Sequence, residues 1–375
     1  LARYLGQRLP SAEREWVSQW VALYNNPRQI EQYQGDRKSH PYRGRMLGQA
    51  VRRLAIRDGL EALQEWQRIK KLYDFDAQEI TRTEHYIIRN LVREPAQVAY
   101  DFIRQVDMGE AGELAHAARM RSALLREDWP QLKAWFDDLP ESMRREAKWR
   151  YWLARATEGT GDFDRAKALY AEVAQERSYY GFMAADQINA DYHLDHIETP
   201  VDPLVMAQIA NIDAVERARE LFYLERWTDA RREWIDATRD MNPAQLKAAA
   251  KIAEQKGWHD RAIFTLARTG YWDDLELRFP LVHSTLVDEN AARNGIDKAW
   301  IFAVMRQESA FMHNARSHAG AMGLMQLMPA TARAVSRDLK RKPPRRSQLL
   351  DPEINILLGS AYLRQMKSEL ADSSI

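Results

Sequence analysis

The sequence predicts an all-α protein that contains a degenerate helical-repeat superhelix, and three observations indicate this fold class. Before about residue 290, apolar residues recur at intervals of three and four, as in 141–170 and 246–269, with charged residues between them. Glycine (16) and proline (14) are scarce for a chain of 375 residues, which argues against a β-sandwich or barrel. The third observation is an aromatic residue that recurs in polar turns.

This aromatic residue marks an irregular internal repeat. It occurs four times, as Trp129, Phe163, Trp227 and Trp258, at spacings of 34, 64 and 31 residues. The last three are each followed by Asp and then by Ala on a new helix. The period is that of a helix–turn–helix solenoid unit of the tetratricopeptide kind. Because a two-helix unit cannot bury its apolar face alone, such units stack into a superhelix.

The composition excludes several classes of protein. No cysteine occurs, so we expect no disulfide framework, no thiolate zinc site and no cysteine nucleophile. Lys and Arg (55) balance Asp and Glu (54), which argues against a nucleic-acid binder. Two prolines in the basic run 340–346 preclude a regular helix there, so we expect a solvated loop. No apolar stretch approaches the ~20 residues of a membrane span.

Two breaks in the pattern predict three domains. The segment 192–203 interrupts the helical periodicity with two prolines and indicates a linker, and the character of the sequence changes again after Pro280. We therefore expect a superhelical domain over 1–192, a helical linker domain over 193–279 and a third domain over 280–375. His193 and His196 have a spacing that suits a metal ion on a helix, but their context is a loop, so we expect no metal and no cofactor.

The third domain carries the candidate catalytic group, Glu308. A helix over 297–309 places Ile301, Met305 and Glu308 on one stripe, with the carboxylate at the C-terminal end. Burial and the helix dipole would both disfavour the ionised form there, so we expect a raised pKa. A protonated carboxylic acid is the group that general-acid cleavage of a glycosidic bond requires. The alternative is a surface glutamate, or one paired with Arg306.

The segment 317–329 has the composition of a binding cleft. It contains two glycines and three methionines, namely Gly320, Gly323, Met322, Met325 and Met328. The glycines permit positive φ or a close approach of the backbone, and the methionines supply adaptable apolar surface. Gln326 can both donate to and accept from sugar hydroxyls and amides. The alternative is a loop with ordinary core methionines.

Together these segments closely resemble the soluble lytic transglycosylases. The resemblance rests on Gln-Glu-Ser-Ala at 307–310 and on Gln326 within Gly-Leu-Met-Gln-Leu-Met-Pro, eighteen residues after the glutamate. It continues through 349–355 and 359–363, and more weakly through 272–280. It implies a periplasmic enzyme whose lysozyme-like domain is carried on an α-superhelix. No secretory signal is visible in the chain, which begins with Leu1.

The resemblance also implies a reaction. Members of the family cleave the β-1,4 bond between N-acetylmuramic acid (MurNAc) and N-acetylglucosamine (GlcNAc) without adding water, which leaves a 1,6-anhydroMurNAc end. By resemblance Glu308 acts as acid and then as base, Ser317 lies near the acetamido group, and Gln326 and Met328 line the glycan cleft. Met325 either lines the cleft or belongs to the core.

The spacing of carboxylates is consistent with this one-carboxylate reaction. Ordinary glycosidases use two carboxylates, and no Asp or Glu occurs between Glu308 and Asp338. Asp351 or Glu353 could nevertheless fold back toward Glu308. A hydrolytic muramidase is therefore a further alternative.

One departure from the family supports a different class of function. After Leu363 the family continues with an Ala-Tyr-Asn-Ala-Gly stretch, which this sequence lacks. We therefore expect a chain that is incomplete, above all at its C-terminal end. The alternative function is a non-catalytic helical-repeat scaffold that binds peptidoglycan or cell-wall enzymes. In either case the expected partners are peptidoglycan glycan strands, with cell-wall synthases as candidate protein partners, and we expect a monomer.

Overall fold

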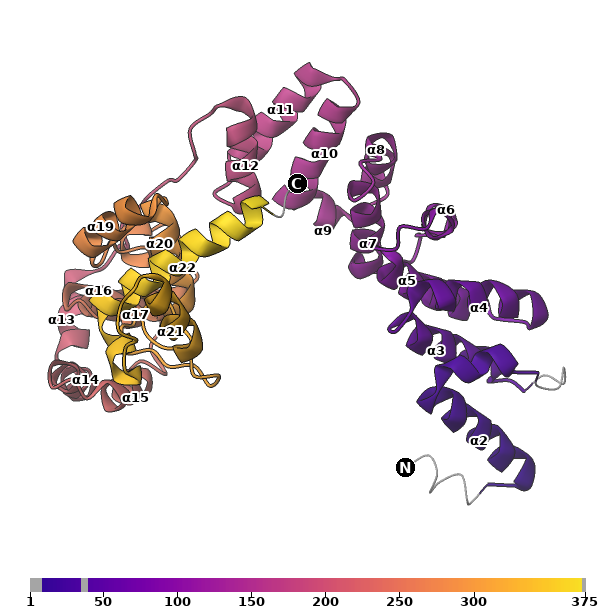
Figure 1. The fold of residues 1–375 in the computed structure, drawn as a ribbon, viewed down its shortest axis with the longest axis horizontal. Helices are drawn as coiled ribbons and strands as arrows, with labels where there is room; N and C mark the ends of the chain where they lie inside the picture. The colour runs from indigo at the N-terminus through magenta and orange to yellow at the C-terminus, as the bar shows by residue number, and fades with distance from the viewer. Residues whose placement is uncertain (1–8, 35–39, 373–375) are drawn as a thin grey trace. The chain divides into compact units, whose positions relative to one another are not determined.

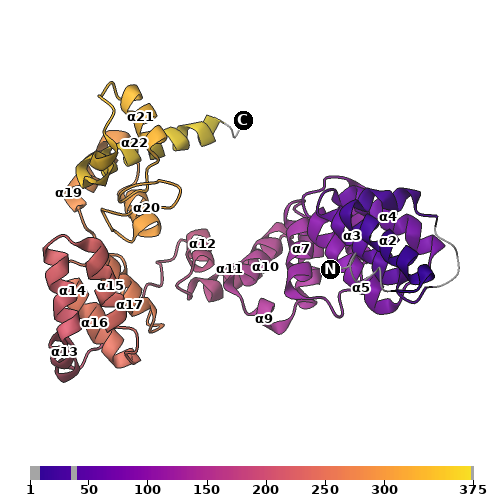
Figure 2. The same ribbon diagram turned by 90° about the horizontal axis from the view of Figure 1, so that it is seen from below.

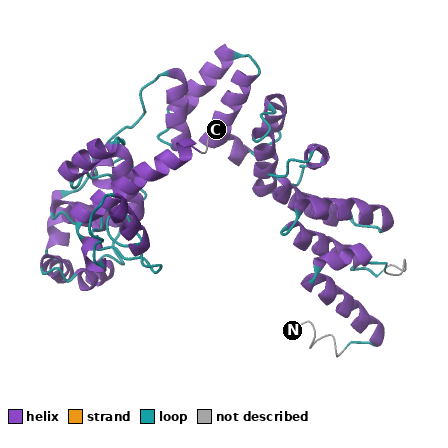
Figure 3. Ribbon diagram, in the orientation of Figure 1, coloured by secondary structure: helices purple, strands orange, loops and turns teal. Residues whose placement is uncertain are grey.

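The computed structural model describes residues 9–34 and 40–372, and this part of the chain is helical, as predicted. Figure 3 shows helices joined by loops, and the only β-structure among the described residues is a pair of isolated bridges, Arg316–Met322 and Met322–Leu327. None of the described helices is long and apolar enough to cross a membrane. The chain divides into two compact units, residues 1–194 and 195–375.

The first unit is a succession of helices that stack one after another along the chain (Figure 1). They are α2 (Ser11–Asn25), the 3-10 helix η1 (Pro27–Gln32), α3 (Arg43–Ala55), α4 (Gly59–Leu72), α5 (Ala77–Leu91), α6 (Gln97–Gln105), α7 (Glu113–Leu124), α8 (Trp129–Asp137), α9 (Glu141–Arg144), α10 (Ala147–Gly159), α11 (Phe163–Ala174) and α12 (Tyr179–Ile188). One apolar core runs from Leu23 to Ala156, and a second joins α10 to α12. Fully buried Trp66 and Trp149 belong to the first of these cores.

The second unit contains two groups of helices, which Figure 2 shows side by side. The first group consists of α13 (Pro203–Ala210), α14 (Asp213–Tyr223), α15 (Trp227–Ala237), α16 (Pro243–Gln255), α17 (His259–Ala267) and α18 (Leu275–Arg278). The second consists of α19 (Ser284–Asn294), α20 (Lys298–Ser309), α21 (Pro329–Asp338), the 3-10 helix η2 (Arg346–Leu350) and α22 (Pro352–Asp372). Ile263 of α17 is buried within the core of the second group, so the two groups pack directly on each other.

The predicted aromatic repeat corresponds to the starts of helices. Trp129, Phe163 and Trp227 are the first residues of α8, α11 and α15, and Trp258 is the N-cap residue of α17. Their environments differ, because Trp258 is 2% exposed whereas Phe163 is 67% exposed. The four aromatic residues therefore share a place at the start of a helix, and each aromatic side chain makes its own contacts.

The predicted linker is a segment without regular secondary structure, residues 190–202. The division between the compact units falls within it, after Leu194, and the three-domain organisation stays a prediction. In the same segment, Nδ1 of His196 accepts a hydrogen bond from the backbone N–H of Leu275 (3.1 Å).

The basic run 340–346 begins at the end of α21 and continues as a mostly exposed loop into η2, as expected.

The linker is attached to the second unit by a buried carboxylate. Asp274, which is fully buried, accepts hydrogen bonds from the N–H of Thr199 (2.8 Å), its hydroxyl (2.7 Å) and the N–H of Leu277 (3.0 Å). Burial raises the pKa of Asp274, but these hydrogen bonds and the charge of Lys251 outweigh it and lower the pKa below its ordinary value. The ionised form thus stabilises the folded state.

Replacing this carboxylate should destabilise the second unit. Asp274→Ala leaves three buried donors unpaired, so we expect a loss of about 2–4 kcal/mol in the free energy of unfolding measured with urea. Asp240→Ala, at an exposed aspartate, is the matched control and should change it by less than about 0.5 kcal/mol.

The pH dependence of unfolding provides a second check. Because the folded-state pKa of Asp274 is lowered, its stabilisation is complete above the unfolded-state pKa near ~3.9 and is lost as the pH falls through the folded-state value. Wild-type protein should lose this contribution in acid, and the alanine variant should lack it. Equal acid sensitivity of the two proteins would contradict the assignment.

Candidate functional site

Helix α20 carries Glu308 in its last turn. Asp297 caps the helix, because its carboxylate accepts from the N–H of Ala299 (2.8 Å), and Ile301 and Met305 are fully buried. The helix ends in two non-glycine residues with left-handed backbone, Ala310 (φ 49°) and Phe311 (φ 67°). Such conformations are costly and persist only where the surroundings hold them. The chain thus turns sharply immediately beyond Glu308.

The residue after the glutamate holds this helix end in place. Ser309 is buried, and its hydroxyl lies 2.8 Å from the carbonyl of Leu324 and 3.0 Å from that of Met305. A buried hydroxyl needs such partners. The Glu-Ser pair of the sequence therefore combines one residue that faces outward with one that joins α20 to the segment containing Leu324.

That segment is in turn organised by Asn355 of α22. Asn355 is fully buried, accepts from the N–H of Met325 (2.8 Å), and donates to the carbonyls of Met322 (2.9 Å) and Leu349 (2.7 Å). Gly323 has φ +77°, and a Cβ on it would lie 2.3 Å from both the Asn355 amide and the Leu349 carbonyl. Only glycine fits there.

Three of the predicted site residues line one cleft of about 930 Å³, namely Glu308, Ser317 and Gln326. The Ser317 hydroxyl accepts from the N–H of Ala321 (3.0 Å), which fixes the turn it occupies. Gln326 is half-buried with φ 47°, and its amide donates to the carbonyl of Gly323 (2.9 Å). The cleft therefore combines a carboxyl, a hydroxyl and an amide, groups that can exchange protons and hydrogen bonds with a sugar.

The expectation that Glu308 is buried on the apolar stripe is wrong. Ile301 and Met305 lie in the core, but Glu308 is exposed in the cleft. The stripe ends because the chain turns at Ala310, and Ser309, not Glu308, occupies the position that packs on the Leu324 segment. The predicted burial of Glu308 is thus absent.

The two methionines have different positions, and neither lines this cleft. Met325 is 6% exposed in the core, and a Cβ on Gly359 of α22 would lie 2.3 Å from its sulfur. Of the two alternatives for Met325, the structure supports the core, because Asn355 holds its backbone where the side chain inserts against α22. Met328 is 41% exposed at the start of α21, and its contact with glycan stays a prediction.

The opposite wall of the cleft comes from the preceding group of helices. It consists of the turn before α15 and the first residues of that helix: Glu225, Arg226, Trp227, Thr228, Asp229 and Arg231. Two carboxylates lie in this wall, and that of Asp229 is paired with Arg226 (2.7 Å). Asp351 and Glu353, which could have folded back toward Glu308, do not line the cleft.

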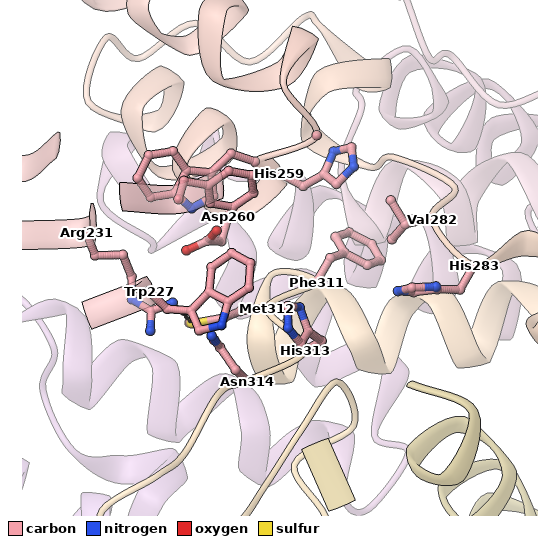
Figure 4. A pocket seen from close by; sticks show the side chains of 13 residues that line it. Trp227, Arg231, His259, Asp260, Val282, His283, Phe311, Met312, His313 and Asn314 are labelled. Carbon is pink, nitrogen blue, oxygen red and sulfur yellow. Dashed lines mark hydrogen bonds between the residues drawn. The ribbon is translucent and has the colours of Figure 1, made fainter. Parts of the chain in front are cut away.

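A smaller cavity of about 330 Å³ lies behind this wall (Figure 4). Trp227, Arg231, Met312 and Asn314 line both spaces. The Trp227 and His313 rings meet edge to face, with centroids 5.1 Å apart. Burial lowers the pKa of three histidines that line the smaller cavity, namely His259, His283 and His313. Unprotonated imidazoles at neutral pH are expected there.

Sequence reasoning missed the contribution of α15 to the site. Trp227 appeared only as one copy of the repeat, and Arg231 had no distinguishing pattern. Residues 312–314 lie close after the Glu-Ser pair in the sequence and contact α15 in the structure. Nothing in the sequence shows which helix packs against them. No cluster of three metal-ligating side chains occurs in the part of the chain that the structure describes.

Two family models match the second unit. Residues 208–275 match the soluble lytic murein transglycosylase L domain, and residues 285–375 match the transglycosylase SLT domain. The first corresponds to the helices that supply α15, and the second to the segment from α19 onward. The cleft therefore lies between the two matched regions.

Curated proteins with the same description are similar to the chain. It is 31% identical over 259 residues to the soluble lytic murein transglycosylase of Escherichia coli K12, an alignment that covers 68% of this chain and 40% of that protein. It is 27% identical over 259 residues to the putative soluble lytic murein transglycosylase of Haemophilus influenzae, covering 68% and 42%. The aligned part of the chain thus covers less than half the length of these curated relatives.

Solved structures resemble nearly the whole chain. The lytic transglycosylase Slt of Pseudomonas aeruginosa, solved as an inactive mutant, superposes with a TM-score of 0.87 and 34% identity over 99% of this chain and 60% of that one. The 70 kDa enzyme SLT70 of Escherichia coli gives 0.82 and 25% over 98% and 60%. The predicted fold class, a helical-repeat superhelix followed by a lysozyme-like α domain, is confirmed.

The two methionines should respond differently to truncation. Met325→Ala removes a core side chain and should lower the free energy of unfolding by about 2–5 kcal/mol. Met328→Ala, at an exposed position, should change it by less than about 0.5 kcal/mol. Urea unfolding of both variants checks this, and unchanged stability of Met325→Ala would contradict its placement in the core.

Proposed function

We propose that this chain, which belongs to the soluble lytic murein transglycosylase family, cleaves peptidoglycan glycan strands at the β-1,4 bond between MurNAc and GlcNAc and leaves 1,6-anhydroMurNAc ends. The observation that carries the proposal is the cleft shared by Glu308, Ser317 and Gln326. Glu308 and Gln326 come from the two motifs of the family resemblance, Ser317 lies between these motifs in the sequence, and the fold brings all three to one cleft.

Glu308 is the proposed acid and base. Its carboxyl first gives a proton to the leaving glycosidic oxygen while the C1–O bond breaks, with the substrate's acetamido group assisting at C1. The carboxylate then takes the proton of the muramic 6-hydroxyl while the oxygen of this hydroxyl forms a bond to C1. No water is consumed, and Glu308 regains its initial protonation state. General acid–base catalysis of this kind contributes about 10²–10⁴-fold to a rate.

The surroundings of Glu308 support this role. Its side chain is exposed to the cleft, while its neighbour Ser309 secures the helix end through Leu324. A catalytic group on a fixed helix end is positioned more precisely than one on a mobile loop. In addition, the solved Pseudomonas relative is an inactive mutant in which one glutamate is replaced by glutamine.

The remaining proposals follow from the family. We place the chain in the periplasm as a monomer that acts on glycan strands, with cell-wall synthases as candidate partners. Relatives from Gram-negative bacteria are named soluble enzymes, and a chain without cysteine suits an oxidising compartment. Hydrolysis by a glycosidase uses a second carboxylate. Because the carboxylates of Glu225 and Asp229 line the same cleft as Glu308, hydrolysis is the competing reaction.

Digestion of purified murein, followed by mass spectrometry of the products, tests the reaction. A lytic transglycosylase yields muramic ends that are lighter by one water than the reducing ends left by hydrolysis. Reducing ends would overturn the non-hydrolytic assignment, and binding of murein without any product would favour the non-catalytic scaffold.

The role of Glu308 is tested by substitution. Glu308→Gln should lower turnover by about 10²-fold or more, because the amide can neither give nor take the proton, and should leave unfolding by urea unchanged. Glu353→Gln, at an exposed glutamate outside the cleft, is the matched control and should retain wild-type turnover. Full activity of Glu308→Gln would remove Glu308 from the proposed mechanism.

A further inference from the structure

A strongly basic surface surrounds the loop between α21 and η2. Of the fourteen residues 333–346, seven are cationic and only Asp338 is acidic. Asp338 accepts a hydrogen bond from the side-chain amide of Gln365 (3.0 Å) and pairs with none of the cations. Because the net charge of the whole chain is only +1, this surface concentrates positive charge at one place and attracts anionic partners. The seven cations are exposed and without an ion pair among the described residues: Arg333, Arg337, Lys340, Arg341, Lys342, Arg345 and Arg346.

The loop borders a groove whose floor is apolar. The groove has a volume of about 480 Å³, which lies in the range of ligand-binding pockets. Its floor comes from α22, where Ile354 and Leu357 are half-buried and Leu358 is buried. Its rim is cationic and comes from the loop. The remaining residues that line the groove are Ser336, Arg341, Lys342, Pro343, Pro344, Arg345 and Gln348.

Contacts at both ends hold the rim in one conformation. At the first end, the backbone N–H of Arg341 donates to the carbonyl of Ser336 in the last turn of α21 (2.8 Å). At the other end, the backbone N–H of Arg345 donates to the side-chain oxygen of Gln348 (2.8 Å). Between them, the prolines at 343–344 have a fixed φ. A groove that is already formed loses less conformational entropy when it binds a ligand.

The recessed position of the apolar floor favours a peptide over a lipid surface. Peripheral binding to a membrane combines basic groups with apolar side chains that enter the lipid. Among residues 329–369, all of which the structure describes, no Leu, Ile, Val, Met or aromatic side chain is exposed. The floor is therefore covered only by a ligand that brings a protruding apolar side chain of its own. The cationic rim calls for carboxylates on either side of that side chain.

We propose that this basic groove binds an acidic segment of a partner protein, which inserts one apolar side chain between Arg341 and Arg345 onto Leu357. Carboxylates of the segment pair with the rim, and its apolar side chain covers the floor. A ligand with carboxylates alone would leave the floor in water and lose that part of the binding free energy. The inference does not depend on the proposed reaction, because none of the residues 340–346 lines the cleft of Glu308.

The basic surface adjoins the turn that carries Ser317. The backbone N–H of Gly320 donates to the carbonyl of Ser317 (3.0 Å). A Cβ on Gly320 would lie 3.5 Å from Nη2 of Arg346. A partner bound to the basic groove is therefore held beside the cleft that contains Glu308, and two proteins joined in this way act on each other's surroundings at a high effective concentration.

Binding of a synthetic peptide tests the inference. The probe is a fluorescein-labelled peptide, Glu-Asp-Glu-Phe-Glu-Asp-Glu, titrated with the protein and followed by fluorescence anisotropy at low salt and at ~0.15 M salt. We expect the probe to bind at both salt concentrations. A peptide with Ser in place of Phe should bind about 10-fold more weakly or less, and a peptide with every acid replaced by its amide should not bind. Arg341→Gln combined with Arg345→Gln should weaken binding of the probe by about 3- to 30-fold, as expected for two exposed charge pairs.

A matched pair of substitutions separates the local charge from the overall charge. Arg364→Gln combined with Lys367→Gln removes the same charge from exposed positions of α22 outside the groove and should leave the affinity for the probe unchanged. An equal loss in both double variants would mean that net charge alone attracts the peptide. Equal affinities for the Phe and Ser peptides would mean that the floor is not used.

Either of these results overturns the inference, and so does the absence of any binding of the probe. Vesicles of phosphatidylglycerol and phosphatidylcholine provide the remaining comparison. Sedimentation of the wild-type protein with these vesicles, without binding of the probe, would identify the basic groove as part of a membrane-binding surface and would also overturn the inference.

Discussion

The side chain of Asn355 is the interaction on which the candidate site depends. It contacts three backbone groups from two segments, and together with Gly323 it forces the chain from Met322 to Met325 into one conformation. Because a buried amide must have its donors and acceptors satisfied, that conformation is well defined. The Leu324 carbonyl is thereby presented to Ser309, which in turn holds the helix end that bears Glu308. The position of Glu308 thus follows from a chain of buried polar contacts.

The second unit forms the cleft from two helical groups with different tasks. The segment from α19 onward supplies the carboxyl, hydroxyl and amide groups, whereas α15 supplies the aromatic ring of Trp227 and the guanidinium of Arg231. Packing of Ile263 into the core of the second group keeps the two walls together. The region that matches the L domain therefore contributes one wall of the cleft.

Errors of the sequence-based site prediction have one common cause. The helical periodicity of the sequence placed Glu308 on the same stripe as Ile301 and Met305. The helix and the burial of Ile301 and Met305 were predicted correctly. Phase alone cannot show where the core ends, and here the core ends at Ser309 because the next residues adopt left-handed backbone. The methionine spacing was uninformative for a similar reason, since Met325 and Met328 lie in a segment whose turns are imposed by α22.

The sequence by itself determined the helices, the linker and the residues that meet around Glu308. These features depend on short-range periodicity, on proline and glycine, and on motifs whose members lie within about twenty residues. Only the tertiary structure decided which of these side chains are exposed, and that Arg231 lines the same cleft as Glu308. The contacts of Arg231 join residues 81 and 83 positions apart, and such pairings arise from the packing of whole helices, which a local pattern does not specify.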